Sequence, residues 1–523
     1  MDPEGKLAVE ERNGRKKIDD KSSSNAQGKM SEALLCSRLC TIHGSKDSKH
    51  WMFVSVVLNV IFALVLIFRK DTGFSTLSLE NSFKVVPRKS VDLENKLICE
   101  DNESPDRQKV YKDNLSYGGA NFGECYSYFA DENCLNIASD RIINLDHGDP
   151  TMFAAYWHAV GGASTTVILG WQRMSYFANK QLFWFVEQEL EREIRSLHKV
   201  VGNAVTEGRH IVIGTGSTQL FQAALYALAP PDRSKPASVV SASPFYSSYP
   251  LITDYLKSEI YRWAGDAMSF QPQSPNDAYI ELVTSPNNPD GTTRHPVVNG
   301  TGPVVYDLAY YWPHYTPIIA AADHDLMLFT VSKSTGHAGT RIGWAIVKDV
   351  EVAKRMAKFV ELNTIGVSQD AQIRATHILR TVVNAYAQKG SSPYALDRRE
   401  GLDRNKLFHY GYSVMEYRWR QLQAAVSGGD RFSVPHFPPE FCSFFGEMIT
   451  PHPAFAWLRC NKESDCHGVL KAEGILTRSG LHFGANSEYV RVSMLDQHSS
   501  FNIFLNRMKA LSSVEVRTAL VTQ

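Results

Sequence analysis

The stretch TVSKSTGHAGTRIGWA, from Thr330 to Ala345, decides the fold of this chain. The apolar run LMLFTVSK (Leu326 to Lys333) overlaps its beginning and predicts a buried strand that ends at a lysine. A loop with two glycines follows from Ser334 to Thr340 and leads to Arg341. Because ligands gather at the carboxyl ends of strands in α/β sheets, Lys333 and Arg341 are candidate site residues.

Four other apolar runs have the same character and together predict an α/β fold. They are HIVIG (His210 to Gly214), ASVVSAS (Ala237 to Ser243), YIELVTS (Tyr279 to Ser285) and PVVYDLA (Pro303 to Ala309). A helix is expected after the first of them, from Ser217 to Ala229. Continuous apolar runs are typical of parallel strands covered on both faces. Functional side chains are therefore expected just past each run.

Polar side chains do follow the runs. They are Ser217 and Thr218 after a glycine pair, Asn288 in the turn PNNPDG, Asp307 and Tyr310, and Thr330 and Ser332 with Lys333. Each has an ordinary alternative when taken alone: Lys333 as a surface lysine, Asp307 as a helix N-cap, Arg341 as a rim charge. Their recurrence at successive strand ends favours one shared site.

Pyridoxal 5'-phosphate (PLP) chemistry requires these residue types together. An amine must form the imine, an anion must keep the pyridine nitrogen protonated, and donors must hold the ring oxygen and the phosphate. We assign the amine to Lys333, which is the catalytic residue, and the anion to Asp307. Tyr310 and Asn288 are expected at the ring oxygen, and Arg341, Thr330, Ser217 and Thr218 at the phosphate, with Ser332 also counted as cofactor-binding. No CxxC pair suggests zinc, and no metal site is expected.

Several longer motifs resemble the plant alliinase and tryptophan aminotransferase-related family. They are NLDHGDPT (Asn144 to Thr151), MSYF (Met174 to Phe177), GTGSTQL (Gly214 to Leu220), SPFYSSYP (Ser243 to Pro250), TSPNNPDG (Thr284 to Gly291), DLAYYWP (Asp307 to Pro313), TVSKSTGHAGTRIGWA and VRVSM (Val490 to Met494). The resemblance covers roughly residues 140 to 510. It implies an aspartate-aminotransferase-like, fold-type I PLP enzyme with a large, mainly parallel-sheet domain and a smaller α+β domain.

The resemblance also implies roles for three residues that the strand ends do not mark. Tyr176 is similar to the tyrosine that reaches the phosphate of the neighbouring subunit, which implies a homodimer. Tyr246 is similar to the aromatic residue that stacks on the pyridine ring. Arg491 is similar to the arginine that binds the substrate carboxylate, for which a planar guanidinium is suited. A surface ion pair is the alternative for Arg491.

The region before the enzyme has a different composition. Residues 1–50 are polar and predict a disordered tail, and the uncharged run from Trp51 to Phe68 predicts a single transmembrane helix. The alternatives for that run are a buried core helix and a secretory h-region. We expect a stem at 69–98, an eroded EGF-like cysteine segment at 99–135, the N-terminal part of the small domain with a dimer arm at 136–180, a large PLP-binding domain at 181–405 and a C-terminal small domain at 406–523.

The cysteine segment and the sequons bear on topology. Gly123 and Tyr128 stand where some family members carry cysteines, although Cys125 and Cys134 can still pair. The charges that flank the membrane run are nearly balanced and set no orientation. Sequons at Asn102, Asn114 and Asn299 favour a lumenal catalytic domain in the endoplasmic reticulum or another endomembrane. A cytosolic enzyme with unused sequons would look the same.

The leading functional prediction is transamination. The chain has 55 Lys and Arg against 55 Asp and Glu, so it has no net field that would attract nucleic acid, and amino acids and keto acids are the expected partners. The resemblance implies conversion of L-tryptophan to indole-3-pyruvate in auxin biosynthesis, with pyruvate or another keto acid as acceptor. The rivals are an alliinase-type C–S lyase acting on cysteine sulfoxides and an inactive, membrane-tethered scaffold.

Overall fold

The computed structural model describes residues 141–521, apart from 181–182, 231–234, 273, 275–276 and 388–405. All of these residues belong to one compact unit, Gly123–Gln523. The predicted tail, membrane helix, stem and cysteine segment lie outside the described residues, as do the sequons at Asn102 and Asn114, and they stay predictions. Among the helices of the described part, none is long and apolar enough to cross a membrane.

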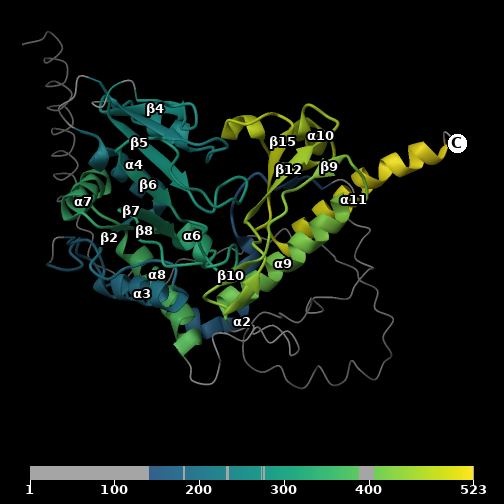
Figure 1. Ribbon diagram of the computed structural model, residues 1–523. Coiled ribbons are helices and arrows are strands. Elements are labelled where there is room, and N and C mark those ends of the chain that lie inside the picture. The colour runs from purple at the N-terminus through teal and green to yellow at the C-terminus, as the bar shows by residue number, and fades with distance from the viewer. Residues whose placement is uncertain are drawn as a thin grey trace, which may run out of the picture. The chain divides into compact units, whose positions relative to one another are not determined.

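A seven-stranded sheet forms the centre of the larger part (Figure 1). In spatial order its strands are β2 (His210–Thr215), β8 (Ile342–Val347), β7 (Leu326–Thr330), β6 (Val304–Asp307), β5 (Tyr279–Thr284), β3 (Ala237–Ser241) and β4 (Tyr261–Asp266). All five predicted strands are present. The strands β4 and β8 were not predicted, and β8 is antiparallel to both of its neighbours, so the sheet is mixed.

The predicted strand from Leu326 to Lys333 is wrong in its last three residues. The strand β7 ends at Thr330, and the short helix α6 (Val331–Ser334) begins there. The Thr330 hydroxyl accepts a hydrogen bond from the backbone N–H of Ser332 at 3.1 Å, and so caps this helix. Lys333 therefore projects from a helical turn just beyond the sheet.

Helices cover the sheet on both faces, and the strands β5, β7 and β8 are therefore buried at every residue. The helix α4 (Gly216–Leu228) packs on α7 (Val350–Thr364), and α3 (Gln188–Val201) packs on α8 (Gln369–Ala387). The remaining helical segments of this part are α5 (Tyr249–Tyr255) and η4 (Ala338–Thr340).

The smaller part contains an antiparallel sheet in the order β14 (Arg478–Ser479), β15 (Tyr489–Ser493), β12 (Phe455–Cys460) and β9 (Phe432–Ser433). Its other elements are α9 (Leu407–Val426), the hairpin of β10 (Glu440–Cys442) and β11 (Glu447–Ile449), α10 (Cys466–Ala472), η5 (Gly480–Phe483) and α11 (His498–Val521). The strand β1 (Ile143–Asn144) pairs with β13 (Ile475–Leu476), so the beginning of the described chain belongs to this smaller part. The short helical segments η2 (Thr151–Phe153), α2 (Ala154–Val160) and η3 (Gly161–Ser164) follow β1 in the chain.

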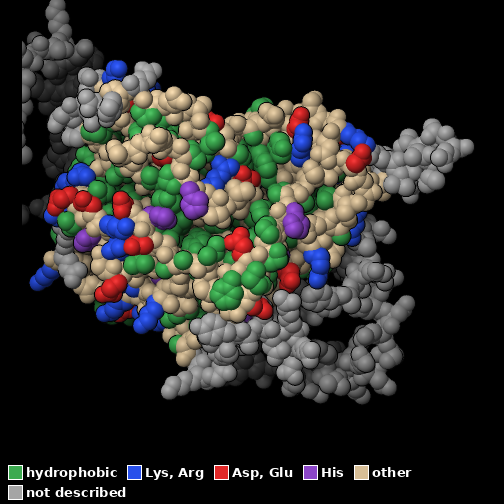
Figure 2. All heavy atoms as spheres, in the orientation of Figure 1, with side chains coloured by type: hydrophobic (Ala, Val, Ile, Leu, Met, Phe, Trp, Pro, Cys, Tyr) green, Lys and Arg blue, Asp and Glu red, His purple; other side chains and the backbone are tan. Residues whose placement is uncertain are grey.

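Two further features were not visible in the sequence. A disulfide links Cys460 at the end of β12 to Cys466 at the start of α10. On the face shown in Figure 2, basic and acidic side chains are interspersed.

Candidate active site

The topology brings the predicted residues to one edge of the large sheet. The strands β5, β6 and β7 are parallel neighbours. Asn288 follows β5, Asp307 is the last residue of β6 and Lys333 follows β7, so all three lie at the same edge. The strand β8 runs the opposite way and therefore begins at that edge, directly after Arg341. The antiparallel direction of β8 is what places Arg341 beside the ends of the other strands.

A cavity of about 410 Å³ lies at this edge. It is lined by every predicted site residue except Tyr176: Ser217, Thr218, Tyr246, Asn288, Asp307, Tyr310, Thr330, Ser332, Lys333, Arg341 and Arg491. The small sheet contributes Phe455, Arg478 and Arg491 to the wall, so the cavity lies between the two parts of the compact unit.

Lys333 extends its side chain into this cavity. Its Nζ donates to the carbonyl of Gly148 and lies 5.9 Å from the centre of the Tyr310 ring. Loss of hydration lowers the pKa of Lys333 to about 8, and the positive charges of Arg491 and Arg341 act in the same direction. Near neutral pH a larger share of this amine is therefore neutral than of an ordinary lysine, and the neutral form is what a nucleophile or proton acceptor requires.

Asp307 is held by donors on both carboxylate oxygens. The backbone N–H of Ala309 donates to Oδ1 at 3.1 Å, and the hydroxyl of Tyr249 donates to Oδ2 at 3.1 Å. Burial raises the pKa of Asp307, while these two hydrogen bonds and the nearby Lys333 oppose that rise. No helix begins directly after Asp307 in the described chain, so its carboxylate does not cap a helix. It accepts from a turn N–H and faces the cavity.

The first turn of α4 forms one end of the cavity, where free backbone N–H groups and the helix dipole favour an anion. Gly216 has φ 73°, and a Cβ there would collide with the guanidinium of Arg341. Glycine at position 216 therefore lets the Arg341 guanidinium approach the start of α4 closely. Ser217 and Thr218 follow Gly216 in the first turn of this helix. The hydroxyl of Thr330 contacts the Ile342 carbonyl at 2.9 Å and is engaged within the protein.

Arg491 is a buried cation and not a surface ion pair, since only 3% of it is exposed. Its NH1 donates to Asn288 Oδ1 at 3.1 Å, and its NH2 donates to the carbonyl of Asp146. The guanidinium lies 4.1 Å from the centre of the Phe455 ring. Burial lowers the pKa of Arg491 to about 10, and Nε has no hydrogen-bond partner among the described residues. A buried cation with an unpaired donor is suited to an incoming carboxylate.

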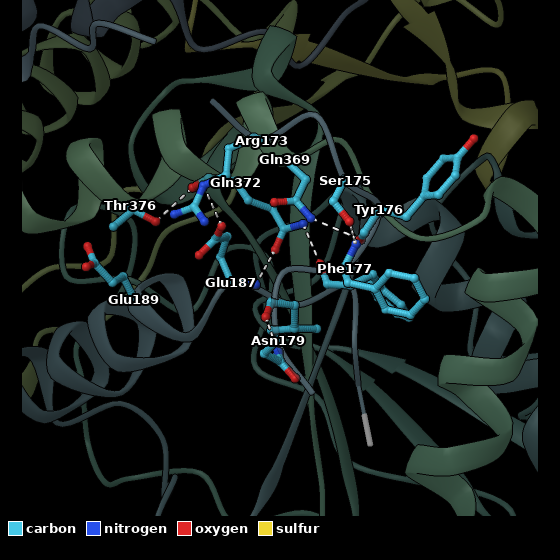
Figure 3. A network of polar contacts seen from close by, with 12 residues as sticks. Arg173, Ser175, Tyr176, Phe177, Asn179, Glu187, Glu189, Gln369, Gln372 and Thr376 are labelled. Carbon is cyan, nitrogen blue, oxygen red and sulfur yellow. Dashed lines mark hydrogen bonds and ion pairs between the residues drawn. The ribbon is translucent and has the colours of Figure 1, made fainter. Parts of the chain in front are cut away.

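Tyr176 is not part of the cavity of its own chain. Its side chain is 68% exposed, and Figure 3 shows the phenol pointing away from the polar network that holds its backbone. In that network Gln369 donates to the carbonyl of Tyr176 at 3.1 Å, and Arg173 pairs with Glu187 at 3.0 Å. The segment is fixed to the start of α8, while the ring itself has no place in the described cavity.

The sequence prediction missed several residues of the site. Tyr249 and Gly148 lie inside motifs that were recognised, SPFYSSYP and NLDHGDPT, so a local signal existed. Arg478, which pairs with Asp146 at 2.5 Å, and Phe455 have no such signal. They reach the cavity only through the packing of the small sheet.

The cavity fits PLP by its donor set. A poorly hydrated amine, a partly buried carboxylate, an anion-binding helix start with Arg341, and the buried cation of Arg491 are the groups this cofactor and an amino acid require. The mixed sheet with these groups at its edge defines the class as a lysine-dependent, fold-type I PLP enzyme.

Comparison with known proteins gives the family. The chain belongs to the alliinase family, because the model for the family described as Allinase matches residues 143–512. This family is PLP-dependent. Tryptophan aminotransferase-related protein 2 of Oryza sativa subsp. japonica is 53% identical over 72% of this chain and 74% of its own. The protein of the same name from Arabidopsis thaliana is 54% identical over 71% and 81%, and alliin lyase 2 of Allium sativum is 34% identical over 79% and 86%.

Solved structures of aminotransferases are also similar to the chain. One from Staphylococcus aureus covers 74% of this chain and 100% of its own at 16% identity, with a TM-score of 0.48. The aspartate aminotransferase of Thermotoga maritima covers 71% and 92% at 17% identity, with a TM-score of 0.46. No conclusion about the chemistry follows from these two likenesses.

The low pKa of Lys333 predicts its reactivity in the cofactor-free protein. The neutral amine forms as pH rises through about 8 and is lost below it, because poor hydration disfavours the charged form. Modification of Lys333 by an amine reagent, followed by peptide mass spectrometry, should be half-maximal near that pH. Lysines at the surface titrate near 10.4 on average, roughly two units higher. A midpoint for Lys333 in that higher range would contradict the prediction.

Proposed function

We propose that this protein is an aminotransferase that converts L-tryptophan to indole-3-pyruvate with pyruvate or another keto acid as acceptor, as part of auxin biosynthesis. The observation that carries the proposal is the placement of buried Arg491 beside Lys333 in one cavity, which suits an α-amino acid held by its carboxylate. The choice of tryptophan rests on the relatives at 53% and 54% identity, which are named for tryptophan aminotransferase.

In this proposal each residue has a defined task. PLP, when bound, supplies the electron sink that makes the Cα proton of the substrate acidic. Lys333 accepts that proton at Nζ and returns it to the reacting molecule at a different carbon, which its lowered pKa allows near neutral pH. Arg491 orients the substrate by its carboxylate, and Asp307 holds negative charge at the ends of the central strands.

A C–S lyase is the second candidate, because alliin lyases share 34% identity with this chain. The same proton transfer to Lys333 begins both reactions, and the groups in the cavity serve either of them. The higher identity to the tryptophan aminotransferase-related proteins favours transamination. An inactive scaffold is disfavoured because Lys333, Asp307 and Arg341 surround one cavity.

We also propose that the enzyme acts as a homodimer in which Tyr176 serves the cavity of the partner. The segment that carries Tyr176 exposes several large apolar side chains to solvent: Val167, Leu169, Trp171, Met174 and Phe177. Apolar patches of this kind mark interaction surfaces. A second copy of the chain would cover these side chains, and its cavity would receive the Tyr176 phenol of the first copy.

The reaction can be tested with an amino-acid panel. The purified enzyme with PLP should form indole-3-pyruvate from tryptophan only when a keto acid is present, and Lys333→Ala should abolish this turnover while remaining folded. Keto acids are followed by chromatography, and folding by circular dichroism. Release of pyruvate and ammonia from a cysteine sulfoxide without an acceptor would show a lyase instead. Activity of Lys333→Ala within tenfold of wild type would remove this lysine from the mechanism.

The two arginines should separate substrate binding from cofactor binding. Arg491→Lys should retain the absorbance of bound cofactor but lower kcat/KM roughly 30-fold or more for every amino acid, since disrupting one partner of a buried, hydrogen-bonded charge pair costs about 2–5 kcal/mol. Arg341→Lys should weaken cofactor binding, since an ammonium cannot reproduce the guanidinium fork. The reverse pattern would exchange the two assignments.

The trans role of Tyr176 predicts complementation between two defective copies. Tyr176→Ala should bind cofactor more weakly, and Lys333→Ala should be inactive. In a mixed dimer, the site with an intact Lys333 receives an intact Tyr176 from its partner, so cofactor affinity at that site should return to the wild-type value. Titration of co-purified, differently tagged dimers measures this. If Tyr176 served its own chain, that site would keep the weakened affinity.

A further inference from the structure

Tyr249 lies in the wall of the cavity, next to Asp307. It is the first residue of α5, and only 2% of it is exposed. Its ring stacks on Phe221 with 5.1 Å between centres and meets Tyr246 edge to face at 5.3 Å. Its hydroxyl lies 3.1 Å from Asp307 Oδ2 and 2.7 Å from Thr284 Oγ1.

The chemistry of these groups fixes the direction of the two hydrogen bonds. An ionised carboxylate can only accept, so the single hydrogen of the Tyr249 hydroxyl points to Asp307. The hydroxyl of Thr284 must then donate to the oxygen of Tyr249. A directed chain from Thr284 through Tyr249 to Asp307 results, and each bond polarises the next.

We propose that Tyr249 is a positioning residue that acts through Asp307: it holds this carboxylate ionised and aimed at the ring nitrogen of the cofactor, with Thr284 as its support. Only Ala309 N–H and the Tyr249 hydroxyl donate to the carboxylate among the described residues. Burial disfavours the charged form of Asp307, and the hydroxyl offsets part of that cost. The proposal rests on Asp307 as the partner of the ring nitrogen.

The cofactor itself offers a probe for this role. We compare the affinity of the cofactor-free protein for PLP with its affinity for 1-deaza-PLP, in which a C–H group replaces the ring nitrogen. If Tyr249 acts through Asp307 and the ring nitrogen, Tyr249→Phe should weaken PLP binding roughly tenfold, the scale of one hydrogen bond to a charged group. It should leave binding of the deaza compound within about twofold of the wild-type value, because the phenyl ring keeps the stacking on Phe221.

Two further variants keep the test sharp. Thr284→Val should cause a smaller loss, selective for PLP, since it removes only the donor to Tyr249, and it serves as the test if Tyr249→Phe does not fold. Tyr261→Phe removes the hydroxyl of another buried tyrosine, which begins the edge strand β4 and does not line the cavity, and it should change neither affinity.

Two outcomes would overturn the inference, and they differ. If Tyr249→Phe lowered the affinity for PLP and for the deaza compound equally, or lowered neither, Tyr249 would contribute only packing. Equal affinity of the wild-type protein for PLP and the deaza compound would instead remove Asp307 from the ring nitrogen and overturn its assignment as well.

Discussion

The low hydration of Lys333 is the constraint on which the rest of this structure depends. A lysine that is to attack and exchange protons needs a pKa close to neutral, and burial next to other cations lowers the pKa of Lys333 toward that range. Such an environment needs walls on all sides. The large sheet supplies the strand ends, and the small sheet closes the opposite wall with Phe455 and Arg491. The cleft between two sheets is therefore a requirement of the chemistry.

The same cavity must hold opposite charges apart. Asp307 lies at the ends of the central strands with two donors on its oxygens, while Arg341 and Arg491 approach from a different strand and a different sheet. Arg491 is buried, whereas Arg341 is exposed, and the rigid elements that carry these charges decide which part of a ligand each one attracts. Tyr249 and Thr284 extend this order along the cavity wall beside Asp307.

The segment around Tyr176 shows the opposite condition. Its backbone is tied to α8 through Gln369, yet its aromatic and aliphatic side chains face solvent. A fixed backbone lowers the ordering cost of an interface, because less freedom is lost when a partner binds. The proposed binding of a second copy would therefore need little rearrangement of this segment.

By itself the sequence determined the elements and most of the site. The apolar runs identified five strands, and the polar residues after them identified Asn288, Asp307, Lys333 and Arg341, because strand ends are local features of a chain. The sequence misplaced the end of β7. The strand stops at Thr330 because the hydroxyl of Thr330 accepts a hydrogen bond from the Ser332 N–H and so starts a helix, and this bond is not visible in the apolar pattern. It also missed β8 as a strand, although Arg341 had been singled out just before it.

Only the tertiary structure decided which distant residues share the cavity. The antiparallel direction of β8 brings Arg341 to Gly216, and the pairing of β12 with β15 brings Phe455 and Arg491 over Lys333. The link from Tyr249 to Asp307 spans 58 residues, and the link from Arg491 to Asn288 spans 203. Contacts of this range depend on how sheets and helices pack, and no local pattern of side chains encodes them.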